Sequence, residues 1–154
     1  MQTLLIRPDM VVLAPDGKAV VLVEVRNRQN LTADVAAEIR RNLIEHGIKY
    51  GWARFFLMTS QETGYLWDQE SLEPGEIPPP TVEFPMAPVI DHYVPSFANN
   101  GRLRGSAVEL AVSKWLWDLG FGSEHRPNEP YVALAKTDFL QLMKGTHVII
   151  EVDD

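Results

Sequence analysis

The sequence contains no cysteine among its 154 residues, which excludes a disulfide framework, a thiolate zinc site and a cysteine nucleophile. It also has no apolar run near the ~20 residues that are needed to span a bilayer. Its first residues lack the basic and apolar sections of a signal peptide. We therefore expect a cytoplasmic protein that is not associated with a membrane.

Basic residues are scarce. The chain has 14 Lys and Arg against 21 Asp and Glu, which gives a formal net charge of −7. This balance argues against a protein that binds nucleic acid through bulk positive charge. Arginines do occur in local clusters, and a nucleic-acid interface would require these clusters to converge on one face: Arg7, Arg26 and Arg28; Arg40 and Arg41; Arg102 and Arg104.

Signatures of several other function classes are missing. There is no Walker-type loop, no GxGxxG and no nucleophile elbow, so nucleotide hydrolysis, dinucleotide binding and α/β-hydrolase chemistry have no support. The four histidines have no metal-ligand spacing. With 45% apolar residues, a chain of this length has the core of one domain.

The first thirty residues predict a β-hairpin. Two runs rich in Val, Leu and Ile, Leu4–Leu13 and Ala19–Val25, flank residues 15–17, whose Pro-Asp-Gly sequence is typical of a tight turn. Asp9 lies in the first run. Glu24 lies in the second run and shares one face with Arg26, because side chains alternate across a strand.

The loop length decides whether Asp9 joins the face of Glu24. With a four-residue loop, Asp9 faces Leu22 and Glu24 is its diagonal neighbour at roughly 7–8 Å. A two-residue loop places Asp9 directly opposite Glu24, and a three-residue loop without a bulge places them on opposite faces. Such a carboxylate pair is costly in an apolar hairpin unless it faces water or serves a purpose. Two hard oxygen ligands would suit Mg²⁺ or Mn²⁺, and the carbonyl of Val25 is a candidate for a further ligand.

Pro8-Asp9, fourteen intervening residues and then Glu24-Val25-Arg26 resemble the motif of the PD-(D/E)XK nuclease superfamily, with Arg in place of the usual Lys. The resemblance covers about the first half of the chain, residues 1–68, where a helix and a strand are expected to follow the hairpin as in that family. It implies an α/β fold with a central mixed β-sheet flanked by helices, a restriction-endonuclease-like core. It also implies hydrolysis of DNA, with Asp9 and Glu24 as ligands of Mg²⁺ or Mn²⁺.

Arg26 stands where the family usually has Lys, and this difference leaves more than one function open. A guanidinium stabilises developing negative charge but does not accept a proton as a Lys with a lowered pKa does. The chain would then be either a metal-dependent nuclease or a catalytically inactive member of the fold that acts as a binding or assembly module. Under a third hypothesis, the chain is an unrelated α/β domain in which Glu24 and Arg26 form an ordinary ion pair on a solvated strand.

Downstream of the hairpin, the pattern predicts a helix that begins after the N-cap Thr32 and ends at Gly47. We expect its outer face to carry Glu38, Arg40, Arg41 and Glu45. The apolar run Ala53–Thr59 predicts a strand inside the sheet, and residues 65–67 a further short strand. Seven of the eleven prolines lie between Pro74 and Pro95, so residues 69–100 are expected to form an extended connection without regular helix or central strand.

The last third of the chain, residues 101–154, predicts a helix over Ser106–Leu119, a short helix over 137–143 and a final strand over 147–152. Ser106 and Glu109 have the spacing of a capping box. PD-(D/E)XK folds normally begin with a helix that in some members supplies an acidic residue. The helix over Ser106–Leu119 is a candidate for that place, and Glu109 for that acid. Trp115 and Trp117 cannot both face one core, so one of them indicates a second contact surface, such as a homodimer interface.

Overall fold

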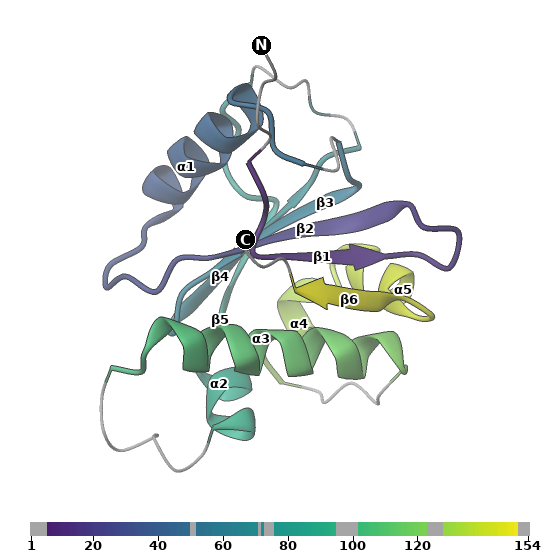
Figure 1. Cartoon of the computed structure of the whole chain (residues 1–154). Coiled ribbons are helices and arrows are strands. Elements are labelled where there is room, and N and C mark those ends of the chain that lie inside the picture. The colour runs from purple at the N-terminus through teal and green to yellow at the C-terminus, as the bar shows by residue number, and fades with distance from the viewer. Residues whose placement is uncertain are drawn as a thin grey trace.

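The computed structural model describes residues 6–49, 52–70, 72, 76–94, 102–122 and 128–150. In this part of the chain a six-stranded sheet with the order β5-β4-β3-β2-β1-β6 forms the centre (Figure 1). Its strands are β1 (Met10–Leu13), β2 (Ala19–Val25), β3 (Phe55–Thr59), β4 (Thr63–Asp68), β5 (Val82–Pro85) and β6 (His147–Ile150). Since β2 and β3 pair in parallel and the other neighbours antiparallel, the predicted mixed sheet is confirmed.

One face of the sheet is covered by α1 (Ala33–Glu45) (Figure 1). Parallel neighbours such as β2 and β3 need a crossover connection, and α1 lies in that connection. The helix buries Ala36, Ala37 and Leu43 against apolar side chains of the sheet, among them Phe56 and Trp67. The strand predicted over Ala53–Thr59 thus lies in the same sheet as the hairpin, and the predicted helix packs on that sheet.

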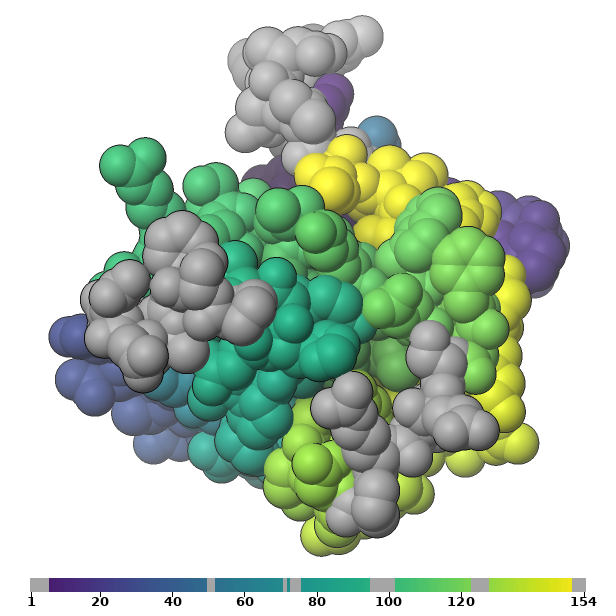
Figure 2. All heavy atoms as spheres, turned by 90° about the horizontal axis from the view of Figure 1, so that it is seen from below, coloured from purple at the N-terminus to yellow at the C-terminus, as the bar shows by residue number. Residues whose placement is uncertain are grey.

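The other face is covered by helices from the second half of the chain. They are α2 (Ala87–Tyr93), α3 (Gly105–Gly120), α4 (Tyr131–Leu134) and α5 (Phe139–Met143), and α2 and α3 form a continuous layer in the space-filling view (Figure 2). This side holds the larger core cluster, where Trp115 of α3 packs with Val23 of β2 and Leu57 of β3. None of the helices in the described ranges is both long enough and apolar enough to cross a membrane.

The caps of α1 agree with the sequence pattern. The Thr32 hydroxyl accepts a hydrogen bond from the Val35 N–H at 3.3 Å, and Gly47, with φ of +82°, follows the end of the helix. The first strand is shorter than predicted, because β1 begins only at Met10. Upstream, Ile6 forms a separate bridge with Ile48 rather than continuing β1. Residues 4 and 5 of the predicted strand lie outside the described residues.

The proline-rich segment contains more regular structure than predicted. Both β5 and α2 lie within it. Pro85 ends a strand at the edge of the sheet, and Pro88 lies in the first turn of α2, where its missing N–H costs no helical hydrogen bond. The expectation of an extended connection was therefore wrong over residues 82–93, because these prolines occupy the positions that strands and helices tolerate.

The predicted capping box of α3 is also wrong. The helix begins at Gly105 with Arg104 as N-cap, and no side chain caps its first turn. Glu109 is thus one turn inside the helix and is not required by the cap. Nearer the end of the chain, the short helix and last strand predicted from the sequence appear as α5 and β6, whereas α4 was not predicted.

Arg40 does not lie on the outer face of α1. Its side chain has no exposed surface and donates two hydrogen bonds to Gln69 Oε1, from Nε at 3.0 Å and from Nη2 at 2.7 Å. The guanidinium carbon lies 5.7 Å from the ring centroids of both Trp52 and Trp67. Burial lowers the pKa of Arg40 to about 10, against the opposing charge of Glu76. Arg41 remains on the surface between Glu38 and Glu45, as predicted.

Candidate functional site

The turn between β1 and β2 sets the register of the hairpin. Residues 15–17 form the loop, closed by a hydrogen bond from the Ala14 N–H to the Lys18 carbonyl at 2.9 Å. Gly17 takes a φ of +86°, which an L side chain rarely adopts. The register shifts between Val12 and Leu13, so the hairpin contains a bulge.

The bulge brings the two carboxylates together. Met10 pairs with Val23, and by the same register Asp9 comes opposite Glu24. From the sequence, a three-residue loop was considered only without a bulge, and that arrangement would have separated Asp9 from Glu24. The extra residue of the bulge restores the alignment that a two-residue loop would give.

Backbone hydrogen bonds tie the two acidic residues to each other. The Val25 N–H donates to Asp9 Oδ2 at 2.7 Å, and the Asp9 N–H donates to Glu24 Oε1 at 3.3 Å. Since the N–H and C=O of one strand residue point to the same side, the Val25 carbonyl is directed toward the β1 side as well. The structure therefore gathers Asp9, Glu24 and the Val25 carbonyl, the three groups predicted as metal ligands, at the end of one hairpin.

The carboxyl group of Glu24 is almost completely buried. It is 4% exposed, and burial, with a further contribution from the negative charge of Asp9, raises its pKa to about 7. Arg26 opposes this shift: its Nε lies 3.3 Å from Glu24 Oε2, although without hydrogen-bond geometry. Because the Arg26 side chain is 41% exposed, water screens its charge, and it compensates Glu24 only in part.

A third acidic residue comes from the far end of the chain. The pKa of Glu109 on α3 is raised, first by burial and then by the negative charge of Asp9. The helix itself packs against β2 and β6, so it brings Glu109 to the hairpin from the C-terminal half. Nevertheless, the described residues contain no group of three or more His, Cys, Asp or Glu side chains close enough to hold a metal. Asp9 and Glu24 form a pair, with Glu109 as a more distant neighbour.

A polar groove of about 460 Å³ lies at the carboxyl ends of β2 and β3. Its lining includes Asn30 from the loop after β2, Ser60 from the end of β3, and Arg102. In sheets with parallel strands, ligands bind outside these carboxyl ends. Arg102 of the lining belongs to the segment that leads into α3, and the next residue, Leu103, accepts a hydrogen bond on its carbonyl from the Asn27 side-chain amide at 2.7 Å.

Three of the clustered arginines are buried or paired with carboxylates. Arg40 is buried, Arg41 pairs with two glutamates of its own helix, and Arg102 pairs with Glu62 on the rim of the groove. Arg26, by contrast, is both half-exposed and beside the carboxylates. Arg26 therefore supplies exposed positive charge directly beside the carboxylate pair.

A comparison with known protein families, curated proteins and solved structures found no match to this chain. The site must be interpreted from its own residues.

Proposed function

We propose that the protein is a Mg²⁺- or Mn²⁺-dependent phosphodiesterase that acts on DNA, a hydrolase of the PD-(D/E)XK kind. The observation that supports this proposal most directly is the register of the hairpin, which sets Asp9 opposite Glu24 beside the carbonyl of Val25. Glu24 of this carboxylate pair lies near the end of β2, a central strand of the sheet. The position of α3, packed against β2 and β6, is consistent with the helix that such folds place before the hairpin.

The donor set suits a hard divalent cation. Asp9, Glu24 and the Val25 carbonyl offer only oxygen ligands, as Mg²⁺ and Mn²⁺ prefer. A buried Glu24 with a raised pKa lacks sufficient positive charge around it, and a bound cation would supply that charge. When bound, such an ion would polarise a phosphodiester and lower the pKa of a water molecule. The protein itself would hold the two carboxylates in register and keep Glu24 away from solvent.

Arg26 would act on the developing negative charge of the phosphate. Its guanidinium lies beside Glu24 and is half-exposed, so it can contact both the carboxylate and a bound substrate. It cannot serve as a general base at neutral pH. The proton acceptor for the attacking water would then be a carboxylate or a phosphate oxygen, and we expect a weaker enzyme than one that has Lys at this position.

One observation favours a second candidate function, a catalytically inactive member of the fold that acts as a binding or assembly module. Arg26 forms an ion pair with Glu24 Oε2, and a metal ion at this site would need the same carboxylate. An internal cation at this point would stabilise Glu24 without a metal. The two candidates differ in a measurable way, because only the first requires the site to bind Mg²⁺ or Mn²⁺.

The decisive experiment is plasmid nicking with Mn²⁺ by the wild type, Arg26→Lys, Arg26→Ala and Asp9→Asn. We expect Arg26→Lys to keep or increase the rate and Arg26→Ala to lower it by about 10²–10³, the effect of removing one charge-stabilising donor. Asp9→Asn keeps an oxygen acceptor for the Val25 N–H but removes the charge, so it should abolish nicking. Asp16→Asn changes an exposed carboxylate in the turn of the same hairpin and is the matched control.

Thermal unfolding of the same variants with and without Mn²⁺ separates the two candidates. A bound ion should raise the melting temperature of the wild type and of Asp16→Asn, but not of Asp9→Asn. Equal melting temperatures at millimolar Mn²⁺ would exclude the metal site. Nicking that survives Asp9→Asn would come from another source, and activity that appears only in Arg26→Lys would identify an inactive member.

We further propose that two copies of the chain associate through the β6 edge of the sheet. Among the described strands β6 has one neighbour, and its exposed Ile150 lines the same surface hollow as the exposed Trp117 of α3. Two such edges can pair about a two-fold axis, because an antiparallel pair is self-complementary. Lys114 and Asp118 lie one turn apart on α3 at this surface, so two antiparallel copies of α3 would place opposite charges together.

A cytoplasmic location remains a prediction from the sequence.

A further inference from the structure

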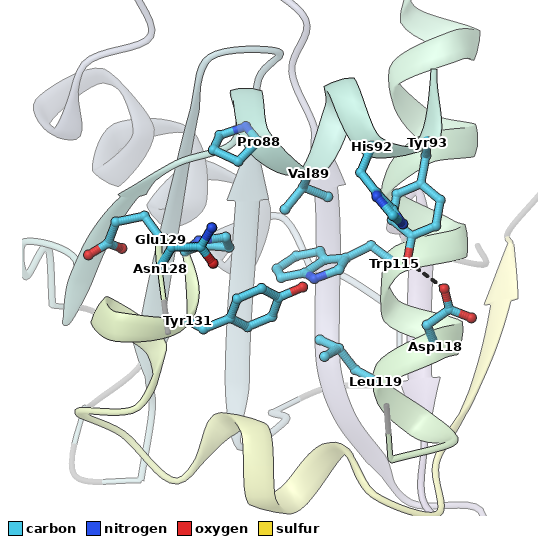
Figure 3. Close-up of a pocket in the computed structure, with 11 residues that line it drawn as sticks. Pro88, Val89, His92, Tyr93, Trp115, Asp118, Leu119, Asn128, Glu129 and Tyr131 are labelled. Atoms are coloured by element: carbon cyan, nitrogen blue, oxygen red, sulfur yellow. Dashed lines mark hydrogen bonds between the residues drawn. The ribbon is translucent and has the colours of Figure 1, made fainter. Parts of the chain in front are cut away.

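A cavity of about 250 Å³ lies between α2, α3 and the segment that leads into α4, within the second half of the chain (Figure 3). None of its lining residues belongs to the hairpin or to the groove at the ends of β2 and β3. Any function of this cavity is therefore separate from the proposed nuclease site.

Aromatic rings form much of the cavity wall. Trp115 of α3 and Tyr131 of α4 extend into the space, and Tyr93 and His92 of α2 line its other side (Figure 3). The His92 and Tyr93 rings pack edge to face with centroids 4.7 Å apart, which fixes their relative orientation. Indole and phenol faces attract organic cations through their quadrupoles, most strongly where water is excluded.

The Asp and Glu side chains among the described lining residues give this part of the cavity an acidic character. Asp118 and Glu129 contribute two carboxylates, and among the described lining residues there is no Lys or Arg. Both carboxylates are held in place: the Tyr93 hydroxyl donates to Asp118 Oδ2, and the Ala133 N–H donates to Glu129 Oε2 at 3.3 Å. The two carboxylates lie at opposite ends of the cavity (Figure 3), so a cation among the rings would meet the fixed negative charge of Asp118, beside the Tyr93 hydroxyl.

One buried donor on the cavity wall lacks an acceptor. Trp115 is 1% exposed, and within the described part of the chain its indole Nε1 has no hydrogen-bond partner. A buried N–H without a partner destabilises a folded protein, and such groups are rare. A ligand with a hydroxyl or carbonyl oxygen would give this donor an acceptor.

We propose that the cavity binds a small organic ammonium ion that also carries a hydrogen-bond acceptor, such as an amino alcohol. The aromatic rings and the Asp118 carboxylate select the cationic end, and the Trp115 indole selects the oxygen. A bare metal ion would leave the aromatic walls without a contact, and a neutral apolar ligand would leave the Asp118 carboxylate without a counter-charge. The proposal does not depend on the function of the hairpin.

The test compares choline with 3,3-dimethylbutan-1-ol, its neutral analogue of the same shape, and with tetramethylammonium, which has no oxygen. Calorimetry and tryptophan fluorescence would follow binding, the latter in Trp117→Phe, which removes an exposed indole outside this cavity. We expect saturable binding of choline and about tenfold weaker binding of the neutral alcohol. Trp115→Phe should weaken choline binding but not tetramethylammonium binding.

Asp118→Asn tests the charge and retains an acceptor for the Tyr93 hydroxyl. We expect it to weaken choline binding about tenfold, whereas Glu62→Gln, which removes a carboxylate that does not line the cavity, should have no effect. Circular dichroism spectra that match the wild type would show that both variants are folded. Equal affinity for choline and its neutral analogue, or no saturation by either cation at tens of millimolar, would overturn the proposal.

Discussion

Glu24 is the residue whose environment departs most from what its chemistry favours. A carboxylate that is 4% exposed, with a pKa of about 7, is protonated in a large fraction of molecules at neutral pH. Because the folded-state pKa lies above the unfolded value of 4.5, the contribution of Glu24 to stability is fully present below about pH 4.5. It is lost as the pH rises through about 7.

Replacing this residue therefore has an effect whose size depends on pH. In the presence of a chelator, Glu24→Gln should be as stable as the wild type near pH 4.5 and more stable above pH 7, by up to about 3 kcal/mol. The amide keeps an oxygen for the Asp9 N–H and removes the charge that burial penalises. Urea unfolding at a series of pH values would measure the difference in the free energy of unfolding.

The matched control for this experiment is Glu83→Gln, because Glu83 is an exposed glutamate on a strand of the same sheet. It should show no such dependence between pH 4.5 and 8. A Glu24→Gln variant that is less stable than the wild type at pH 8 would show that the charge of Glu24 is needed, and that Arg26 compensates it fully without a metal.

Single residues also show where prediction from the sequence stops. The alternation of side chains placed Glu24 and Arg26 on one face, which follows from local geometry. The burial of Arg40 could not be predicted in that way, since its partner Gln69 is 29 residues away in the chain. A charged residue at a helix position next to other charges has the pattern of a solvated face. Only the fold shows that two tryptophans and an amide enclose it.

For helices and strands, strong apolar periodicity was sufficient for prediction. The details of the turns could not be predicted in the same way. The hairpin, α1 and the strand after it were predicted because their apolar spacing and caps are local properties. The alignment of Asp9 with Glu24 depended on a bulge after Val12, which nothing in the apolar pattern specifies. The same limit applies to β5 and α2, where prolines concealed an edge strand and a short helix.

The C-terminal elements illustrate the contribution of long-range packing. The sequence predicted α3 and β6, but their place beside β1 and β2 is a matter of topology. Glu109 was assigned to a capping box because it follows Ser106 at the required spacing. Since α3 begins at Gly105 instead, Glu109 lies inside the helix, and its proximity to Asp9 becomes its more informative property.

For the whole molecule, the proposed association through β6 makes a prediction about size. Ile150→Lys should shift the protein from dimer to monomer in light scattering, because a charge on an edge strand opposes pairing of two edges. Ile77→Lys changes an isoleucine of similar exposure in the proline-rich segment, 49% against 51%, and should leave the mass unchanged. A wild type that remains monomeric at high micromolar concentration would contradict the proposed interface.

Because β6 pairs with β1, the order of the strands in the sheet can be kept while the order of the elements along the chain is changed. Met10 lies opposite Ile150, so the last strand ends where the first one begins. A circular permutant that joins residue 154 to residue 1 and opens the chain between Val94 and Arg102 would preserve all of these strand pairings. We expect it to fold with an unchanged circular dichroism spectrum, and an aggregated or unfolded product would show that the connection from α2 to α3 is required. In the permutant α3 would come first, and β6 would directly precede the hairpin with whose strand β1 it pairs.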